Sequence, residues 1–216
     1  MPRIGGAYAM YGMYQESNGV VSYEAGEGGY LGRMVSANLS NGDDTDNDWY
    51  GDGAVGETDD AFAVGNVELE LGEMLTETAQ KLLDVDVVAL TGNNAISGVT
   101  DEGASMIKYK ANPNIPYIGI GTVVESRYHG VDYYTPVIIN KAKLKQPSTE
   151  VQTTKPGKTI DWGNIRVQGK FFKDDAATPG YKTECTPLTS MAQALAFLRH
   201  VLGVPEPTSS SQNATT

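Results

Sequence analysis

The sequence predicts a mainly β fold with two helices, organised as a single domain over residues 1–203. The chain contains 25 glycines and 12 tyrosines, and short runs of valine, isoleucine and threonine recur between them. Such a composition is typical of strands and tight turns. With 216 residues and 40% apolar content, the chain can bury one substantial core. Two unrelated domains are not expected at this length.

The first predicted element is a β-hairpin near the N-terminus. Residues 6–15 form a strand-like run, followed by the turn Glu16–Gly19 and a second short run, Val20–Tyr23. An Asn18-Gly19 pair between two such runs is a strong local signal for a hairpin turn. Strand propensity then returns from Leu31 to Leu39.

A strongly acidic segment follows, from Asn41 to Asp60. It holds eight acidic residues and no lysine or arginine. Apart from Trp49 and Tyr50, it has little apolar surface to bury, so its ordering entropy is not offset. The sequence therefore predicts a long loop over residues 41–60, with at most one short strand in it.

The next segment alternates between apolar and acidic residues. Val67, Leu69 and Leu71 fall on one face of an extended chain, and Glu68 and Glu70 fall on the other. Side chains point to opposite faces with a period of two in a strand. This pattern predicts a strand with one buried face and one wet face.

An amphipathic helix is predicted directly after residue 72, from Glu73 to Asp84. Glu77 and Lys81 stand four residues apart, which is the spacing of a helical ion pair. The apolar residues recur at helical spacing and form one stripe, made of Met74, Leu75, Ala79, Leu82 and Leu83.

A long β-hairpin is predicted in the second half of the chain. Its strands are Ile115–Val124 and Val131–Ile139, with His129-Gly130 in the turn, and another strand follows at Asn164–Phe172. Three lysines lie between these elements, and lysines of this kind are typical of edge strands. They are Lys141, Lys143 and Lys145.

The C-terminal helix is predicted over residues 187–202. Thr186 can cap its first turn, and Pro187 suits the first helical position. Gly203 is placed to end the helix. Residues 204–216 are rich in serine and threonine and are expected to be a disordered tail.

Charge is concentrated in the first third of the chain. The formal net charge is −11, and residues 1–80 hold fifteen acidic residues against two basic ones. A chain without a basic stripe is not expected to grip nucleic-acid backbones. It has no signal-peptide pattern and no apolar run of membrane-spanning length, so we expect synthesis in the cytoplasm and no membrane span. The single Cys185 excludes an intramolecular disulfide and is expected to be buried.

The sequence shows no catalytic constellation. Catalysis requires a nucleophile with a base, paired carboxylates in a pocket, or a metal cluster. His129 falls in a predicted turn, and His200 falls in the last helical turn, where the helix dipole favours a positive charge. Gly119-Ile-Gly121 lies in a predicted strand and lacks the third glycine of a nucleotide-binding loop. We therefore expect a protein that is not an enzyme and has no cofactor.

The acidic loop contains a partial calcium-binding pattern. Counted from Asp46, the residues Asp48, Gly51 and Glu57 occupy the third, sixth and twelfth positions of an EF-hand loop. The fifth position is Tyr50 instead of Asp or Asn, and strand-like sequence precedes the loop where an EF-hand has a helix. A solvated acidic loop is the preferred interpretation, and a calcium site is the alternative.

Four segments occur in a characteristic order: Ile4–Tyr11, Trp49–Glu57, Val67–Leu71 and Tyr117–Gly121. In this order they resemble a family of major tail proteins, the tail tube proteins of long-tailed bacteriophages (siphophages) of Gram-positive bacteria. The resemblance covers most of residues 1–172 and is one of pattern and order.

This resemblance implies a β-sandwich or half-barrel with a flanking helix, whose copies join edge to edge as hexameric rings. Stacked rings would form the virion tail tube, with tape-measure and other tail proteins as partners and with DNA passing through without specific binding. The acidic loop would lie between rings or face the lumen through Asp43, Asp44, Asp46, Asp48, Trp49, Tyr50, Asp52 and Glu57. Glu68 and Glu70 would face the lumen or form a wet strand face.

Two other functions stay open from the sequence. One is a β-sandwich binding module for virion decoration or for a receptor or carbohydrate, which the many tyrosines favour. The other is a carboxylate-based hydrolase, which lacks a recognisable nucleophile or acid–base pair. The acid of residues 1–80 also has a simpler interpretation as the solubility of a surface loop.

Overall fold

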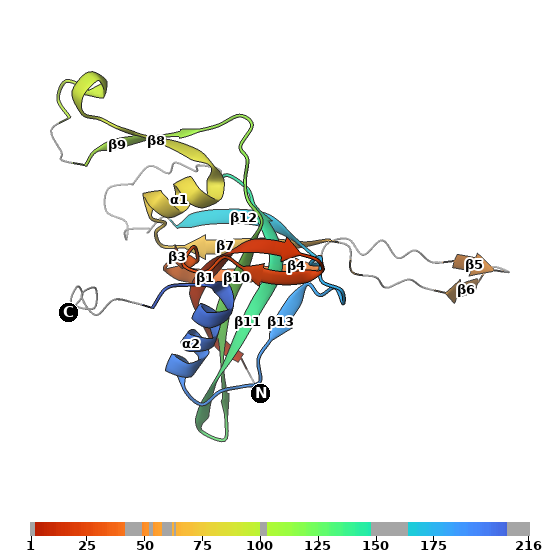
Figure 1. Ribbon diagram of the computed structural model, residues 1–216. Helices are drawn as coiled ribbons and strands as arrows, with labels where there is room; N and C mark the ends of the chain where they lie inside the picture. The colour runs from red at the N-terminus through yellow and green to blue at the C-terminus, as the bar shows by residue number, and fades with distance from the viewer. Residues whose placement is uncertain are drawn as a thin grey trace, which may run out of the picture.

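The computed structural model describes residues 3–41, 49–51, 54–57, 62, 64–99, 103–147 and 164–206. The described chain is mainly β and antiparallel, with two α-helices, as predicted (Figure 1). The strands are β1 (Arg3–Ser17), β2 (Val20–Tyr23), β3 (Gly29–Gly32), β4 (Met34–Asn41), β5 (Trp49–Gly51), β6 (Ala54–Glu57), β7 (Val64–Leu71), β8 (Val85–Ala89), β9 (Ser105–Tyr109), β10 (Ile118–Tyr128), β11 (Val131–Leu144), β12 (Ile165–Phe172) and β13 (Lys182–Glu184). The helices are α1 (Thr76–Leu83), the short 3-10 helix η1 (Gly92–Asn94) and α2 (Met191–Leu202).

Nine of the described strands form one curled sheet. Its path runs β2-β1-β10-β11-β12-β7-β4, with β3 added to β1 and β13 added to β11. Only Arg33 separates β3 from β4, yet β3 pairs with β1 and β4 pairs with β7, near opposite ends of the path. One chain segment thus connects both sides of the sheet and forces it to curl.

The inward face of the curled sheet holds the larger apolar core. Val67, Leu69 and Leu71 of β7 are at most 2% exposed, whereas Glu68 and Glu70 on the opposite face are half-buried, so the predicted alternation is confirmed. Helix α1 contributes the side chains of Ala79, Leu82 and Leu83 to this core. Other members include Tyr11, Leu31, Ile118, Ile139, Leu144 and Phe171.

Helix α2 covers the outward face of β1, β10 and β11. Its buried stripe of Ala194, Leu198 and Leu202 packs against Met10, Val123 and Ile138. Adjacent residues of β11 therefore serve different cores: Ile138 points towards α2, and the next residue of the strand points into the curled sheet. Val204 belongs to the α2 cluster and is 7% exposed, so the predicted disordered tail of 204–216 is wrong at its first residue. Residues 207–216 lie outside the described part of the chain.

Both predicted hairpins are confirmed. In the first turn, Asn18 and Gly19 have φ of 53° and 74°, and in the second, His129 and Gly130 have φ of 48° and 79°. Positive φ at both central residues is the requirement of a type I′ hairpin turn. The second hairpin joins β10 and β11 and is longer than predicted, since pairing extends from Ile118 to Ala142.

Both helices begin later than predicted. Leu75 stands before α1 in extended conformation with its side chain 63% exposed, so the predicted stripe loses its first turn. Lys81 forms an ion pair with Glu27 from a distant segment instead of the predicted pair with Glu77. Helix α1 ends at Asp84, which adopts the left-handed conformation.

Helix α2 begins at Met191 and not at Pro187, because the preceding segment is held by the sheet. The backbone of Leu188 exchanges two hydrogen bonds with Tyr134 of β11, at 2.8 and 2.9 Å. Because of this bridge, Thr186 and Pro187 lie outside the helix. Ser190, and not Thr186, is the residue at the N-cap position. Gly203 ends the helix with φ of 64°, as predicted.

Two further expectations about strands need correction. Lys141 and Lys143 lie in β11 and are paired with β12, and β11 is an interior strand that also pairs with β10 up to Ala142; Lys145 is exposed just beyond it. Within the acidic segment, β5 and β6 pair with each other, which gives two short strands instead of one. The remaining residues of 42–60 lie outside the described part of the chain. Strands β8, β9 and β13 were not predicted.

No helix among the described residues is long and apolar enough to cross a membrane.

Candidate functional site

Strand β4 is a free edge of the sheet. It pairs with β7 on one side, and no described strand pairs with its other side. An edge strand presents unpaired N–H and C=O groups that can template another strand. Residues 35–40 of β4 are all exposed. The strand is therefore placed to accept a partner.

The composition of β4 contains none of the residues that usually block an edge. Its eight residues, Met-Val-Ser-Ala-Asn-Leu-Ser-Asn, include no charge and no proline. Natural edges are commonly protected by lysines, prolines or very short strands. Other described edges have such protection: β13 has three residues with a Lys182–Glu184 ion pair at 2.9 Å, and β9 contains Lys108. β4 is the longest uncharged edge in the described part of the chain.

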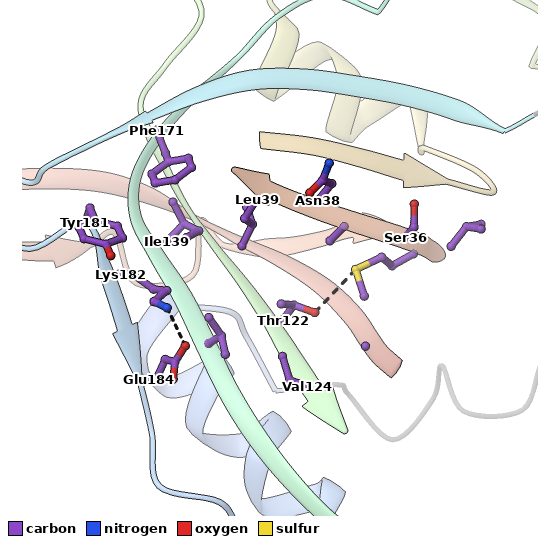
Figure 2. Close-up of a pocket in the computed structure, with 15 residues that line it drawn as sticks. Ser36, Asn38, Leu39, Thr122, Val124, Ile139, Phe171, Tyr181, Lys182 and Glu184 are labelled. Carbon is purple, nitrogen blue, oxygen red and sulfur yellow. Dashed lines mark hydrogen bonds and ion pairs between the residues drawn. The ribbon is translucent and has the colours of Figure 1, made fainter. Parts of the chain in front are cut away.

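A groove with a mixed polar and apolar lining lies beside this edge. The groove has a volume of about 660 Å³ and runs between β4 and the strands β10, β11 and β13 (Figure 2). Its walls include Leu39, Val124, Val137, Ile139 and Phe171. Figure 2 shows the Lys182–Glu184 ion pair on the β13 side. The groove thus combines several apolar side chains with an unpaired backbone along one rim.

The groove is open because the sheet stops at β4. Leu39 is in register with Val67 on the inward face, yet Leu39 is 37% exposed and Val67 only 1% exposed. At the opposite end of β4, the Thr122 hydroxyl lies 3.7 Å from the Met34 sulfur, which brings the strand close to β10. Apolar side chains of the inner face therefore reach solvent at the Leu39 end of the strand.

The outward face of β4, β7 and β12 is polar. Register places Glu70 between Ser36 and Arg166, and Glu68 between Asn38 and Gln168. These two acids share their face with Arg166 and Lys170, so its charges balance. Glu68 and Glu70 therefore lie on a polar face that also carries basic residues.

Hydrogen bonds hold the Glu70 carboxylate on that face. It accepts from the Asn164 amide at 3.0 Å and from the Ser36 hydroxyl at 3.1 Å. These donors, Asn164 foremost, lower the pKa of Glu70 below its ordinary value, and the positive charge of Arg166 acts in the same direction. The Glu70 side chain therefore links β7 to Ser36 of β4 and to Asn164, the residue just before β12.

The structure places the predicted loop residues only in part. Asp43, Asp44, Asp46, Asp48 and Asp52 lie outside the described residues. Trp49 and Tyr50 belong to β5 and Glu57 belongs to β6, where Trp49 and Glu57 are partners in the register. The calcium pattern and the loop's place between rings stay predictions.

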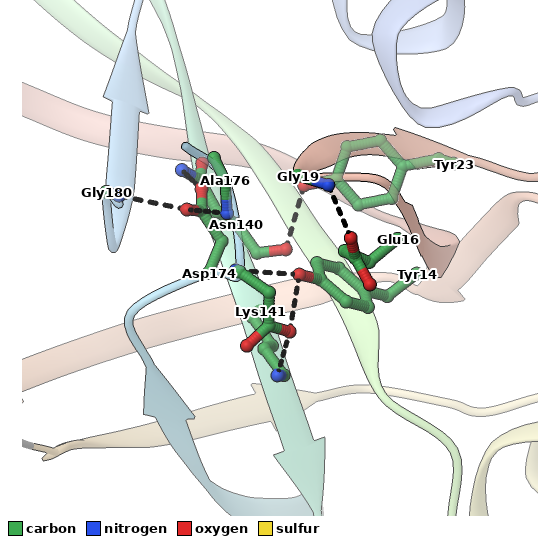
Figure 3. A network of polar contacts seen from close by, with 10 residues as sticks. Tyr14, Glu16, Gly19, Tyr23, Asn140, Lys141, Asp174, Ala176 and Gly180 are labelled. Atoms are coloured by element: carbon green, nitrogen blue, oxygen red, sulfur yellow. Dashed lines mark hydrogen bonds and ion pairs between the residues drawn. The ribbon is translucent and has the colours of Figure 1, made fainter. Parts of the chain in front are cut away.

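A buried carboxylate fixes the loop that delivers β13 to the rim of the groove. Asp174 is 7% exposed and accepts hydrogen bonds from the Asn140 amide at 2.7 Å and from the backbone N–H groups of Gly180 at 2.9 Å and Ala176 at 3.2 Å (Figure 3). The Asn140 side-chain oxygen in turn accepts from the Thr183 hydroxyl of β13 at 2.9 Å. Asp174 thus links β11 to β13 through one network.

Replacing Asp174 by alanine is expected to lower the free energy of unfolding by roughly 2–4 kcal/mol, because buried donors lose their acceptor. The matched control is Asp175→Ala. Asp175 is exposed, and its side chain accepts from Lys141 and the Tyr14 hydroxyl but from no backbone donor among the described residues, so its loss should cost less, about 1–2 kcal/mol. Urea unfolding monitored by circular dichroism measures both. Equal costs for the two variants would show that Asp174 is not the anchor of the loop.

Beside this network, an aromatic and cationic cluster reaches the surface. The Lys141 ammonium lies 5.1 Å from the ring centre of Tyr14 and 4.7 Å from that of Tyr117, and the Lys143 ammonium lies 5.3 Å from Tyr117. Burial, above all, raises the pKa of Tyr14 to about 12. Lys141 and Tyr14 lower the pKa of Asp175. Sequence reasoning missed this cluster because its members come from β1, β11 and the segment before β10.

The described residues contain no group of three or more His, Cys, Asp or Glu side chains that could hold a metal ion. His129 and His200 are both exposed, and Cys185 is half-buried instead of fully buried. Among the described residues, the free edge of β4 and its groove therefore offer the clearest binding surface.

The chain matches no protein-family model, and no curated protein matches it either.

Proposed function

We propose that this chain is a structural virion protein that polymerises through its sheet edges as stacked hexameric rings, forming the tail tube of a long-tailed bacteriophage. The observation that carries the proposal is the free edge of β4, which is eight residues long, uncharged and exposed beside a groove. Such an edge is an aggregation liability in a protein that works as a monomer. In an assembling subunit, the same edge is the joint between copies.

When an edge strand of one copy pairs with a different edge strand of the next copy, the assembly can close into a ring. A contact between unlike surfaces repeats around an axis and closes when the rotation permits, whereas a contact between like surfaces stops at a dimer. The order of the sequence segments is the support for a hexamer and for a virion tail. In this proposal the tape-measure and other tail proteins are partners, and the protein has no enzymatic activity.

The lumen of the tube is proposed to be polar and weakly charged. The outward face of β4, β7 and β12 carries Ser36, Asn38, Glu68, Glu70, Arg166, Gln168 and Lys170. A face of this composition offers no cationic stripe to hold phosphates. DNA would pass such a wall without specific binding. The acidic segment of residues 41–60 is proposed to lie between rings or towards the lumen.

A binding module is the second candidate function, favoured by the cluster around Tyr117. This ring is 42% exposed and lies next to two lysines. Aromatic rings with nearby polar groups are common in binding surfaces for carbohydrates and proteins. The cluster lies at the surface and does not require assembly.

Negative-stain electron microscopy and analytical ultracentrifugation of the purified full chain, over a range of concentrations, test the two candidates. We expect rings or tubes to form as the concentration rises, because strand pairing between copies follows mass action. A protein that stays monomeric at every concentration and binds members of a glycan array would contradict the tail-tube proposal and favour the binding module.

A further inference from the structure

We infer that the strand completing β4 is β9 of a second copy of this chain, carried by the hairpin of β8 and β9. This inference rests on the proposed function and names the second half of its joint. The hairpin forms a sheet of its own, in which β9 pairs only with β8 among the described strands. Its outer edge is therefore unpaired among the described strands, like that of β4, although it carries Lys108.

One face of the hairpin is apolar, and only its β8 half is covered. Val85 and Val87 of β8 are in register with Tyr109 and Ile107 of β9, so all four side chains share one face. Val85 is 2% exposed and Val87 packs on the main core, whereas Ile107 is 39% exposed and Tyr109 is 46% exposed. The uncovered half of this apolar face belongs to β9 and is one strand wide.

The hairpin is held rigidly at its base. The Lys110 ammonium, just beyond β9, lies 2.6 Å from the Asp84 carboxylate and 3.2 Å from that of Asp86, on the β8 side. Asp84 also accepts the backbone N–H of Asn114 at 2.7 Å. Its hydrogen bond with Lys110, foremost, lowers the pKa of Asp84. A preorganised strand loses less entropy on pairing than a flexible one.

The side-chain pattern of β9 matches both faces of β4. Ile107 and Tyr109 alternate with Met106 and Lys108 along the strand. When β9 lies beside β4 with its apolar face inward, Ile107 and Tyr109 enter the groove, where Leu39 is exposed.

The same orientation places Lys108 on the outward face, near the acids Glu68 and Glu70. These acids belong to β7, the strand next to β4. The joint is thus complementary in apolar surface, and it keeps Lys108 on a polar face where acidic residues are present. Since β4 and β9 are different strands, their pairing is a contact between unlike surfaces, the type that closes into rings.

Disulfide cross-linking between copies tests this joint in the full chain. In a Cys185→Ser background, one protein carries Asn38→Cys on β4, and a second protein with a larger affinity tag carries Met106→Cys on β9. Both positions fall on the outward face, and both are exposed. Neighbouring strands place paired residues within the Cα separation that a disulfide requires. Ser36→Cys and Ser40→Cys on the same face cover a shift of register.

After assembly and mild oxidation, we expect a mixed dimer of the two tagged proteins on a non-reducing gel, at one or more of the three β4 positions. Each protein alone should stay uncross-linked. A chain carrying both substitutions should give a ladder of covalent oligomers that ends at six. The control pairs Gln168→Cys with Met106→Cys: Gln168 is exposed on the same outward face, but lies two strands from the edge, and no cross-link is expected.

The outcomes separate this inference from the proposed function. Rings that form without any cross-link between β4 and β9 would overturn the inference and leave ring assembly standing. Cross-linking of the Asn38→Cys protein with itself would show pairing of β4 with β4 and also overturn it. Failure of the Cys185→Ser protein to assemble at any concentration, with the natural chain failing likewise, would count against the proposed function itself.

Discussion

Replacing Gly32 by alanine is expected to lower the free energy of unfolding by roughly 3–5 kcal/mol, combining backbone strain with a steric clash. Gly32 ends β3, and after Arg33 the chain continues as β4. Its φ of 145° is one that residues with a side chain rarely adopt. A β-carbon there would also lie far closer to the Glu73 carbonyl oxygen than van der Waals contact allows.

The clash at Gly32 cannot be relieved by a side-chain rotation, because its partner is backbone. Glu73 lies between β7 and α1, so a shift there would disturb the base of the helix. The junction also decides the curl of the sheet, since the strands on either side of it pair with β1 and β7. Strain at this residue is therefore expected to loosen β4 together with the groove.

The control for this prediction is Gly26→Ala. Gly26 also has positive φ, at 81°, but a β-carbon there would have no atom within 4 Å. Its substitution should cost only the conformational penalty of about 1–2 kcal/mol. Chemical unfolding of both variants gives the comparison. If Gly32→Ala costs no more than Gly26→Ala, the clash with Glu73 does not determine the stability of this junction.

Local signals in the sequence were sufficient for much of the sheet. Asn18-Gly19 and His129-Gly130 could be recognised as turns because positive φ is rare and these residue pairs accept it at low cost. The alternation from Val67 to Leu71 marked a strand because one face is buried and the other wet. In each case, the cause of the structure lies within a few residues.

The elements that escaped prediction are fixed by distant contacts. The sequence around Leu188 predicts the start of a helix, but two backbone hydrogen bonds between Leu188 and Tyr134 make this residue a bridge of the sheet. Lys141 and Lys143 resemble edge lysines, yet they belong to β11, an interior strand that lies between β10 and β12. Short segments such as β8 and β13 offer too few residues for a period to be visible.

Only one component of the candidate site, the uncharged strand, could be predicted from the sequence. The absence of charge from Met34 to Asn41 is visible in the sequence, and a long uncharged strand is a recognisable edge risk. The groove is not visible, because Leu39, Ile139 and Phe171 come together only through the curl of the sheet. Its opening depends on which strand is last, which is a property of topology.

Replacing Leu39 by lysine is expected to raise the concentration required for assembly at least about a hundredfold, while the monomer stays folded. Leu39 points inward beside the free edge and is 37% exposed. In the monomer, a lysine there can extend its ammonium into the open groove, so the loss of stability is expected to be about 1 kcal/mol. An inward-pointing charge next to an edge is a device by which natural sheets prevent pairing.

Assembly changes the surroundings of this side chain. Once a strand from another copy lies beside β4, the groove is covered and the ammonium loses its access to water. Burying an unpaired charge costs several kcal/mol, and each 1.4 kcal/mol corresponds to a tenfold change in an association constant. We therefore expect the association constant of each joint in a ring to fall at least about a hundredfold. Every copy in the ring carries the same penalty.

The control Gln168→Lys adds the same charge to the outward face of β12, an interior strand. Sedimentation velocity measures the oligomeric state of both variants over a range of concentrations, and thermal unfolding verifies that each monomer is folded. If Leu39→Lys assembled at the same concentration as the natural chain, the groove beside β4 would not be covered in the assembly, and the joint would have to lie at another edge. If Leu39→Lys fails to assemble and Gln168→Lys assembles normally, the partner strand must cover the groove. The two variants carry the same added charge and differ in whether that charge lies beside the free edge.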